Sequence, residues 1–147
     1  MKIFELFTIG YEGREIDEFV DLLKQFNISR LIDVREMPIS RKRGFSKYAL
    51  HDRLENENIE YIHMKALGNP SYIRNKLKSD LDYDSFFKEY GKYLSKNKEV
   101  IKEVYQFISD EVSCIMCFER FPEKCHRQVI ANKIKKLDIN GLKIKHI

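Results

Sequence analysis

Twelve residues near the C-terminal end, CFERFPEKCHRQ (117–128), combine two thiols, an imidazole, carboxylates and arginines. Cys125 and His126 stand directly before a segment with helical periodicity. A thiol at the start of a helix has its thiolate stabilised by the helix dipole and by unpaired N–H groups. One hypothesis is therefore a reactive Cys125, with His126 attacking or orienting beside it. The alternative is structural: Cys125 packs the loop against the helix and His126 braces it.

The same stretch offers soft metal ligands in Cys117, Cys125 and His126. His63 or Asp33 could add a fourth ligand from a neighbouring strand end. However, the spacing Cys-x7-Cys-His is not that of a zinc ribbon or finger, and adjacent Cys and His seldom point at one ion without a special loop. We therefore predict neither a metal nor a cofactor, and keep these three residues as weak ligand candidates only.

Cys114 and Cys117 have the Cys-x-x-Cys spacing of redox motifs, but they fall on a predicted strand. Residues three apart on a strand face opposite sides and lie roughly 10 Å apart, so they cannot form a disulfide there. We expect Cys114 to be an ordinary core residue.

Two carboxylates, Asp33 and Glu119, follow predicted strands and could form a general acid/base pair if burial shifts one of them. An equally physical alternative is that both belong to ion pairs that hold the loops. Asp33 would then pair with Arg35. Glu119 would pair with Arg127 or Arg120.

The segment SRKRGFSKY (40–48) supplies cations, hydroxyls and aromatic rings. Ser40, Arg41, Lys42 and Arg43 suit the binding of a phosphate, and the rings could stack on a base. A basic loop can also be merely solvated, so the alternative remains open. The sequence has no glycine-rich phosphate loop, which argues against an ATPase or an NAD enzyme.

Five short β-type segments alternate with helical ones along the chain. The predicted strands are 5–9, 29–34, 59–63, 112–118 and 142–147. The predicted helices are 15–26, 47–58 (capped by Ser46), 82–96, 98–111 and 127–137. This alternation predicts a single α/β domain over 1–147, with a mostly parallel sheet of about five strands and helices on both faces.

In open parallel sheets, ligands bind beyond the carboxyl ends of the strands, where the loops converge. The chemically capable residues of this chain follow the predicted strands. They are Tyr11 and Arg14 after the first strand, Asp33, Arg35, Ser40, Arg41, Lys42 and Arg43 after the second, His63 after the third, and Glu119, Cys125, His126 and Arg127 after the fourth. The sequence therefore predicts a site at this edge of the sheet.

Four blocks carry a family resemblance. They are TIGYEGR (8–14), LIDVREMPISRKRGFSKYAL (31–50), IEYIHMKALGNP (59–70) and CFERFPEKCHRQ (117–128). In order and spacing they resemble domain-of-unknown-function family 488, which implies a compact bacterial or archaeal α/β protein and brings no settled activity. Tyr11 stands where many relatives have a histidine, and Asn69-Pro70 replaces a second glycine.

Composition limits the class of protein. The net charge of +4 and the pI near 8.9 permit an anionic partner without requiring one. No apolar run approaches the roughly 20 residues of a membrane span, and the first residues lack the features of a secretion signal. Three cysteines, an odd number, are best read as reduced thiols. We expect a cytoplasmic protein with no membrane partner, and make no prediction of its oligomeric state.

Two functions follow. The first is an enzyme acting on a phosphate-bearing substrate, a nucleotide or nucleic acid, through the Cys/His/Asp/Glu/Arg site at the strand ends. The second is a non-catalytic nucleic-acid or nucleotide-binding module, in which the Cys/His cluster is structural. An enzyme should bury a carboxylate beside Cys125 and His126 in a concave pocket. A binding module should instead present a flat basic face continuing from Arg41 past Lys47 and Lys76.

Overall fold

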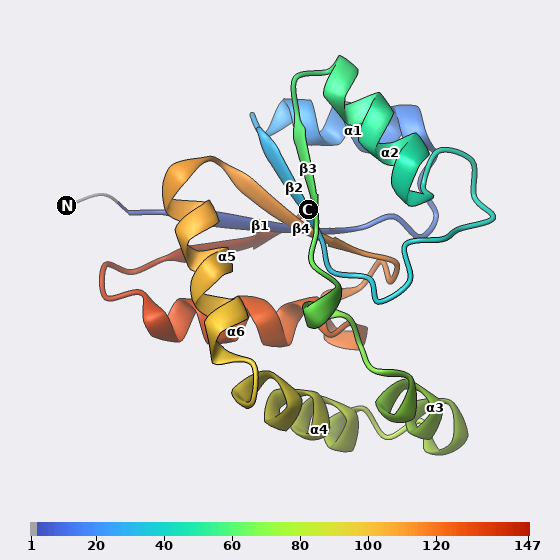
Figure 1. The fold of residues 1–147 in the computed structure, drawn as a ribbon, viewed down its shortest axis with the longest axis vertical. Coiled ribbons are helices and arrows are strands. Elements are labelled where there is room, and N and C mark those ends of the chain that lie inside the picture. The colour runs from blue at the N-terminus through green and yellow to red at the C-terminus, as the bar shows by residue number, and fades with distance from the viewer. Residues whose placement is uncertain (1–2) are drawn as a thin grey trace.

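The computed structural model of the protein describes residues 3–147, and its centre is a five-stranded sheet (Figure 1). The strands are β1 (Glu5–Gly10), β2 (Arg30–Asp33), β3 (Glu60–His63), β4 (Ser113–Cys117) and β5 (Lys143–His146). Their order is β3-β2-β4-β1-β5, and every neighbouring pair is parallel. The predicted α/β class with a parallel sheet is confirmed.

Six α-helices and two short 3-10 turns join the strands. The α-helices are α1 (Ile16–Gln25), α2 (Lys47–Asn56), α3 (Ser71–Asp80), α4 (Tyr83–Ser95), α5 (Lys98–Asp110) and α6 (Arg127–Leu137). The turns are η1 (Lys65–Leu67) and η2 (Pro122–Lys124). Five of the α-helices match the predicted segments to within a few residues.

Helix α3 was not predicted from the sequence. Its residues, SYIRNKLKSD, include a single buried side chain, Ile73, so no apolar stripe marks the helix. It begins directly after Pro70 and packs against α4, away from the sheet (Figure 1). Tertiary packing on α4 therefore supplies the stabilisation that the local pattern does not show.

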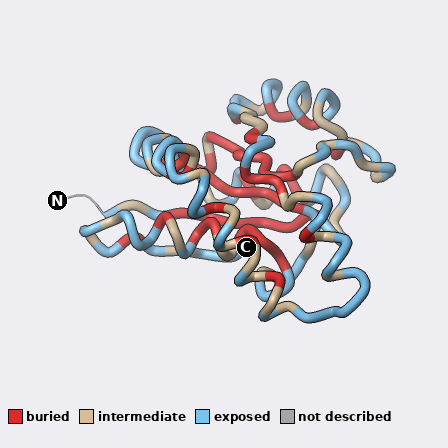
Figure 2. The backbone as a smooth tube through the Cα atoms, turned by 60° about the horizontal axis from the view of Figure 1, so that its bottom comes forward, coloured by how far each residue is buried: buried red, intermediate tan, exposed pale blue. Residues whose placement is uncertain are grey.

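Helices cover both faces of the sheet. Helices α1 and α2 pack over one face and α5 and α6 over the other, and α4 packs on α5 and α6 (Figure 1). The buried backbone is concentrated in the strands between these layers (Figure 2). Cys114 lies in the core on the α1 side and Cys117 in the core on the α6 side, so the expectation that they face apart is confirmed.

The strand register brings four loop starts to one edge of the sheet. Gly10 pairs with Cys117, and Asp33 pairs with both Met116 and His63. Because all strands are parallel, the loops after β1, β2, β3 and β4 leave from the same edge. Among residues 3–147, no helix is long and apolar enough to cross a membrane.

Candidate functional site

A cavity of about 220 Å³ lies at this carboxyl edge, where the sequence predicts a site. Its lining comes from the loops after β1, β2, β3 and β4 and from α3. The lining residues are Tyr11, Arg35, Glu36, Met37, Ile39, Asn69, Arg74, Cys117, Phe118, Glu119 and His126. The loops that converge there thus leave a concave space bordered by a thiol, carboxylates, an imidazole and guanidinium groups.

Four side chains from the end of β4 and the following loop converge beside the cavity: Cys117, Glu119, Cys125 and His126. The Cys117 thiol donates to Glu119 Oε2 at 3.2 Å, and its sulfur lies 3.6 Å from His126 Nδ1. The Cys125 sulfur lies 3.8 Å from the same nitrogen. One ligand atom from each of the four lies within 4.8 Å of the others. We call these four residues the thiol cluster.

The loop that carries the thiol cluster is held by two neighbours. A Cβ at Gly10 would stand 1.8 Å from the backbone oxygen of Glu119, so only glycine lets this loop cross the end of β1. Arg127 is fully buried and donates to the backbone oxygens of Glu119 at 2.5 Å and Arg120 at 3.1 Å. Both contacts fix the path of the loop and hence the position of Glu119.

The orientation of His126 is also fixed. Its Nε2–H donates to the backbone oxygen of Val34 at 2.9 Å, which turns Nδ1 toward the two sulfurs. The ring of Tyr90 meets the imidazole edge-to-face at 5.1 Å. Adjacent Cys125 and His126 therefore do point into one place, contrary to the objection raised from the sequence. The reason is that Cys125 is extended whereas His126 has helical backbone angles at the start of α6.

Burial and mutual contact shift the pKa values in the thiol cluster in different directions. Burial raises the pKa of Cys117, and its contacts with Cys125 and Glu119 raise it further. Burial also acts to raise the pKa of Cys125, but its side-chain contact with Cys117 and the charges of His126 and Arg127 lower it well below the usual value. The pKa of Glu119 is raised, chiefly by burial.

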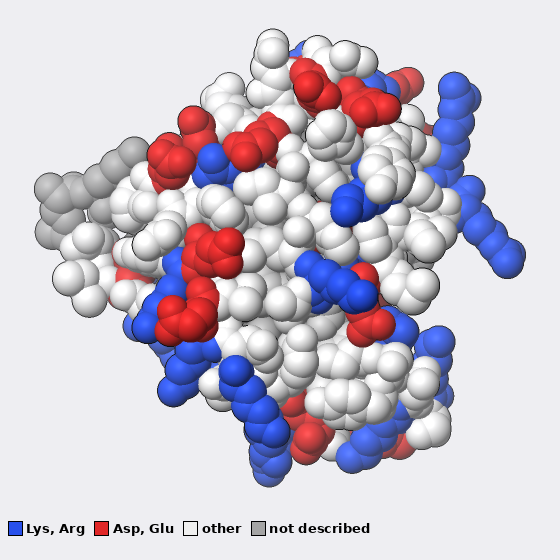
Figure 3. All heavy atoms as spheres, viewed as in Figure 1, with Lys and Arg blue, Asp and Glu red and all other residues white. Residues whose placement is uncertain are grey.

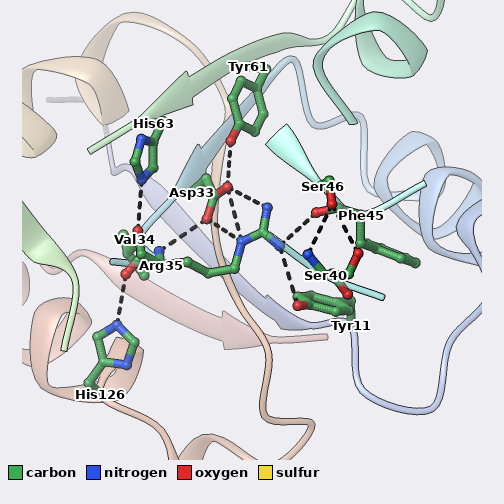
Figure 4. A network of polar contacts seen from close by, with 10 residues as sticks. All are labelled: Tyr11, Asp33, Val34, Arg35, Ser40, Phe45, Ser46, Tyr61, His63 and His126. Atoms are coloured by element: carbon green, nitrogen blue, oxygen red, sulfur yellow. Dashed lines mark hydrogen bonds and ion pairs between the residues drawn. The ribbon is translucent and has the colours of Figure 1, made fainter. Parts of the chain in front are cut away.

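A second polar cluster lies at the ends of β2 and β3, around Asp33 and Arg35 (Figure 4). The Arg35 guanidinium binds the Asp33 carboxylate through Nε at 2.9 Å and Nη2 at 2.7 Å. Tyr61 donates a 2.5 Å hydrogen bond to the same carboxylate. We call Asp33, Arg35 and Tyr61 the arginine cluster. Asp33 is fully buried and forms with Arg35 the ion pair that the sequence offered as the alternative.

The arginine cluster reaches the surrounding loops through further bonds (Figure 4). Arg35 Nη1 donates to Tyr11 Oη at 3.3 Å and to the backbone oxygen of Phe45 at 2.6 Å. Tyr11 stacks on Phe45 at a ring distance of 4.5 Å. His63 Nε2–H donates to the backbone oxygen of Arg35 at 2.8 Å. Tyr11 and His63, both expected to bind substrate, thus help to hold the loop after β2.

Ser40 and Ser46 behave differently from the expectation. Ser46 precedes α2 as predicted, but its side chain does not cap the helix. Instead, Ser46 Oγ accepts from the Ser40 backbone N–H and donates to the Ser40 backbone oxygen, each at 3.0 Å (Figure 4). This reciprocal pair of hydrogen bonds closes the basic segment into a loop, so both serines stabilise the backbone of that loop.

The structure does not bring Arg14 or the basic-loop residues Arg41, Lys42 and Arg43 into the cavity lining. Arg41 and Arg43 are exposed, and Lys42 lies 4.0 Å from Glu15. Arg14 donates to the backbone oxygen of Gly10 at 3.1 Å. Two residues of the same loop, Met37 and Ile39, do line the cavity. These cations are therefore close to cavity-lining residues in the sequence but do not line the cavity themselves.

Two polar residues of the cavity lining, Glu36 and Arg74, were not site candidates from the sequence, and neither were the apolar Met37, Ile39 and Phe118. Arg74 is on α3, which the apolar pattern did not indicate, so its position could not be inferred. It lies 3.9 Å from Glu36 Oε1, a long and loose ion pair. Asn69 Oδ1 is buried without a hydrogen-bond partner among the described residues. The sequence did place Asn69 near this edge, because it follows the third predicted strand.

The fold and the cavity define a parallel α/β protein with a polar site at the carboxyl edge of its sheet. The family model described as "Domain of unknown function DUF488" matches residues 15–134, which is more than half of the chain. The chain therefore belongs to this family, as the four sequence blocks had suggested. Comparison with curated proteins and with solved structures finds no match.

Proposed function

We propose that this protein is an enzyme that acts on a small phosphate-bearing substrate, such as a nucleotide, bound in the cavity at the sheet edge. The observation that carries the proposal is the convergence of Cys117, Glu119 and His126 on a cavity that also exposes Arg74. Ionisable groups gathered in a concave site, with mutual contacts near 3.5 Å, are the usual machinery of catalysis.

Arg74 is the cation best placed to hold a phosphate group. Its contacts with Glu36 Oε1 at 3.9 Å and with the backbone oxygen of Asn69 at 3.4 Å are both long and leave most of the guanidinium available, whereas most donors of Arg35 are taken by Asp33, Tyr11 and Phe45. A guanidinium binds phosphate through two parallel hydrogen bonds. Asn69 Oδ1 offers an acceptor for a hydroxyl or amino group of the same substrate.

The thiol cluster supplies the groups that would touch the reacting atoms. Cys117, Glu119 and His126 line the cavity, while Cys125 is fully buried behind them. Glu119 and His126 are placed to exchange protons with a bound substrate, because both have an atom within 3.6 Å of the cavity-lining Cys117 sulfur. Asp33, held by Arg35 and Tyr61, would support the site without taking part in proton transfer.

The alternative is a non-catalytic module that binds nucleotides or nucleic acid through the basic loop. Such a module would use a continuous positive surface. On the face seen in Figure 3, lysine and arginine side chains are interspersed with aspartate and glutamate. The cavity, of about 220 Å³, suits a small molecule better than a polymer. Both observations favour the enzyme.

We also propose that the protein works in the reducing cytoplasm. Cys114, Cys117 and Cys125 are all free thiols, and the last two lie close enough to react under oxidising conditions. Reducing conditions keep such thiols available.

Phosphorus NMR on a panel of phosphomonoesters, nucleoside phosphates and short oligonucleotides tests the proposal. We expect turnover of a small phosphate ester or nucleotide. Arg74→Gln should raise its KM about tenfold, the equivalent of one charged hydrogen bond. Lys78→Gln is the matched control, because Lys78 is exposed on the same helix and does not line the cavity.

Two outcomes would overturn the enzyme proposal. Salt-dependent binding without turnover of any compound would favour the binding module. Equal losses of binding in Arg74→Gln and Lys78→Gln would show that attraction is diffuse, and would remove the cavity from the explanation.

A further inference from the structure

We propose that Cys117, Cys125, His126 and Glu119 form a binding site for one divalent transition-metal ion of the zinc class. This inference goes beyond the proposed function. With the ion bound, His126 and Glu119 act as ligands in place of proton-transfer groups, while the phosphate-binding role of Arg74 is unchanged. It revises the expectation of no metal, which rested on sequence spacing.

The distances within the thiol cluster match those of a tetrahedral site. A zinc ion with sulfur at about 2.3 Å and nitrogen at about 2.0 Å separates these two ligand atoms by about 3.5 Å. The Cys117 and Cys125 sulfurs lie 3.6 and 3.8 Å from His126 Nδ1, and Cys117 lies 3.2 Å from Glu119 Oε2. All four ligand atoms fall within 4.8 Å of one another. An ion at their centre would require only small side-chain movements.

The imidazole is already oriented as a ligand. Metal-binding histidines characteristically donate their other ring N–H to a backbone carbonyl or carboxylate, which fixes the ring and the tautomer. His126 does this through Nε2–H and the backbone oxygen of Val34 at 2.9 Å, leaving Nδ1 toward the sulfurs. The backbone N–H of Arg127 lies 3.5 Å from the Cys125 sulfur, as expected for a hydrogen bond that supports a thiolate ligand.

The buried charge of Arg127 also supports a metal site in the thiol cluster. Its guanidinium donates to Thr8 Oγ1 and to the backbone oxygens of Glu119 and Arg120, which are all neutral acceptors. A fully buried positive charge needs a negative partner nearby. Two thiolates, one carboxylate and a divalent ion carry a net charge of −1, and this complex would lie directly beside Arg127.

The four ligands differ in their distance from solvent. Cys125 is fully buried, whereas Glu119 is partly exposed and lines the cavity with Cys117 and His126. A carboxylate is the most readily exchanged ligand of such a set, so Glu119 marks the position where a cavity ligand could reach the ion. Two thiolates and an imidazole favour zinc, or iron and cobalt in its place, over magnesium or calcium.

The test is titration of the reduced, chelator-stripped full chain with Zn²⁺ alone, in competition with a chromophoric chelator. We expect one equivalent of zinc to bind. Co²⁺ at the same site should give thiolate-to-metal charge-transfer absorption. Cys125→Ala should weaken zinc binding by at least about 100-fold, the upper end of what outer-shell partners cost. Glu119→Gln should weaken it less.

Two control variants make the titration decisive. Cys114→Ala removes a buried thiol from the same strand outside the cluster, so zinc binding should remain. His51→Ala disrupts a second, exposed group formed with Asp52 and Glu55, and should also leave it unchanged. The proposal is wrong if no cobalt–thiolate absorption appears, or if zinc binding survives Cys125→Ala and is lost in His51→Ala. The titration uses zinc and no phosphate compound, so a chain that binds no zinc would not contradict the phosphate-substrate proposal. A chain that turns over no phosphate compound would likewise not contradict the zinc site.

Discussion

The arginine cluster and the thiol cluster lie at the same sheet edge but differ in how far their polar atoms are already satisfied. In the arginine cluster, the Asp33 carboxylate receives bonds from the Arg35 side chain, the Arg35 backbone N–H and Tyr61. In the thiol cluster, the contacts are the longer and weaker ones of sulfur, and three of the four residues face a cavity. We therefore call the arginine cluster closed and the thiol cluster open.

This difference assigns different tasks to similar residues. A buried ion pair whose partners bond mostly to each other and to nearby protein groups has few hydrogen-bonding groups left for a substrate. The arginine cluster therefore holds the loop after β2, which contributes Met37 and Ile39 to the cavity wall. The thiol cluster retains ligand atoms that point at one another and toward the cavity, as binding or chemistry requires.

The largest effect is expected from a substitution that breaks the arginine cluster. Arg35→Met removes the partner of the fully buried Asp33 carboxylate, and we expect the free energy of unfolding to fall by about 3–5 kcal/mol. Urea denaturation at neutral pH measures this loss. The loss arises because the Asp33 carboxylate stays buried without a positive partner, and not because the attraction between Arg35 and Asp33 is itself large.

The double variant Asp33→Asn/Arg35→Met separates these two reasons. With no carboxylate left to be desolvated, it should recover part of the stability lost in Arg35→Met. A double variant that is as unstable as Arg35→Met, or less stable, would mean that lost packing or lost loop contacts dominate. The description of a closed electrostatic pair would then be wrong.

A smaller effect concerns the loop that carries the open cluster. Gly10→Ala places a Cβ 1.8 Å from the backbone oxygen of Glu119, so the loop must shift. We expect a loss of about 2–3 kcal/mol in the free energy of unfolding, measured by urea denaturation. In the matched control, Gly91→Ala, the new Cβ meets nothing within 4 Å in the interior of α4. This variant should gain about 0.5–1 kcal/mol, and equal losses in both would contradict the close-approach argument.

The sheet edge could be predicted from sequence because it depends on short-range patterns. Alternation of apolar strands with amphipathic helices defines a parallel sheet, and a parallel sheet places all carboxyl-end loops together. That reasoning located Asp33, Glu119, Cys125 and His126 correctly at one edge. It also offered the Asp33–Arg35 ion pair as an alternative.

The rest of the site depends on three-dimensional placement that no local pattern carries. Arg74 reaches the cavity from α3, a helix with one buried residue. The basic residues Arg41 and Arg43 were expected to face the site, but the Ser40–Ser46 bonds close their loop and leave them in solvent. Spacing alone also misjudged Cys125 and His126, because the change of backbone conformation between them decides where both point.

The smallest expected effect tests whether the open cluster is also structural. Cys117→Ala, measured by urea denaturation in reducing buffer with a chelator, should lower the free energy of unfolding by only about 1 kcal/mol. The variant removes one sulfur and its weak hydrogen bond to Glu119, and it leaves no charge without its partner.

Cys114→Ala is the matched control for this variant, since both thiols are buried on β4 and only Cys117 belongs to the thiol cluster. Without metal, the two variants should lose similar stability. With zinc present, the unsubstituted chain and Cys114→Ala should gain stability by mass action, whereas Cys117→Ala should gain much less. A loss in Cys117→Ala as large as in Arg35→Met, already present without metal, would show that both clusters hold the fold. That result would favour the binding module with a structural cysteine cluster.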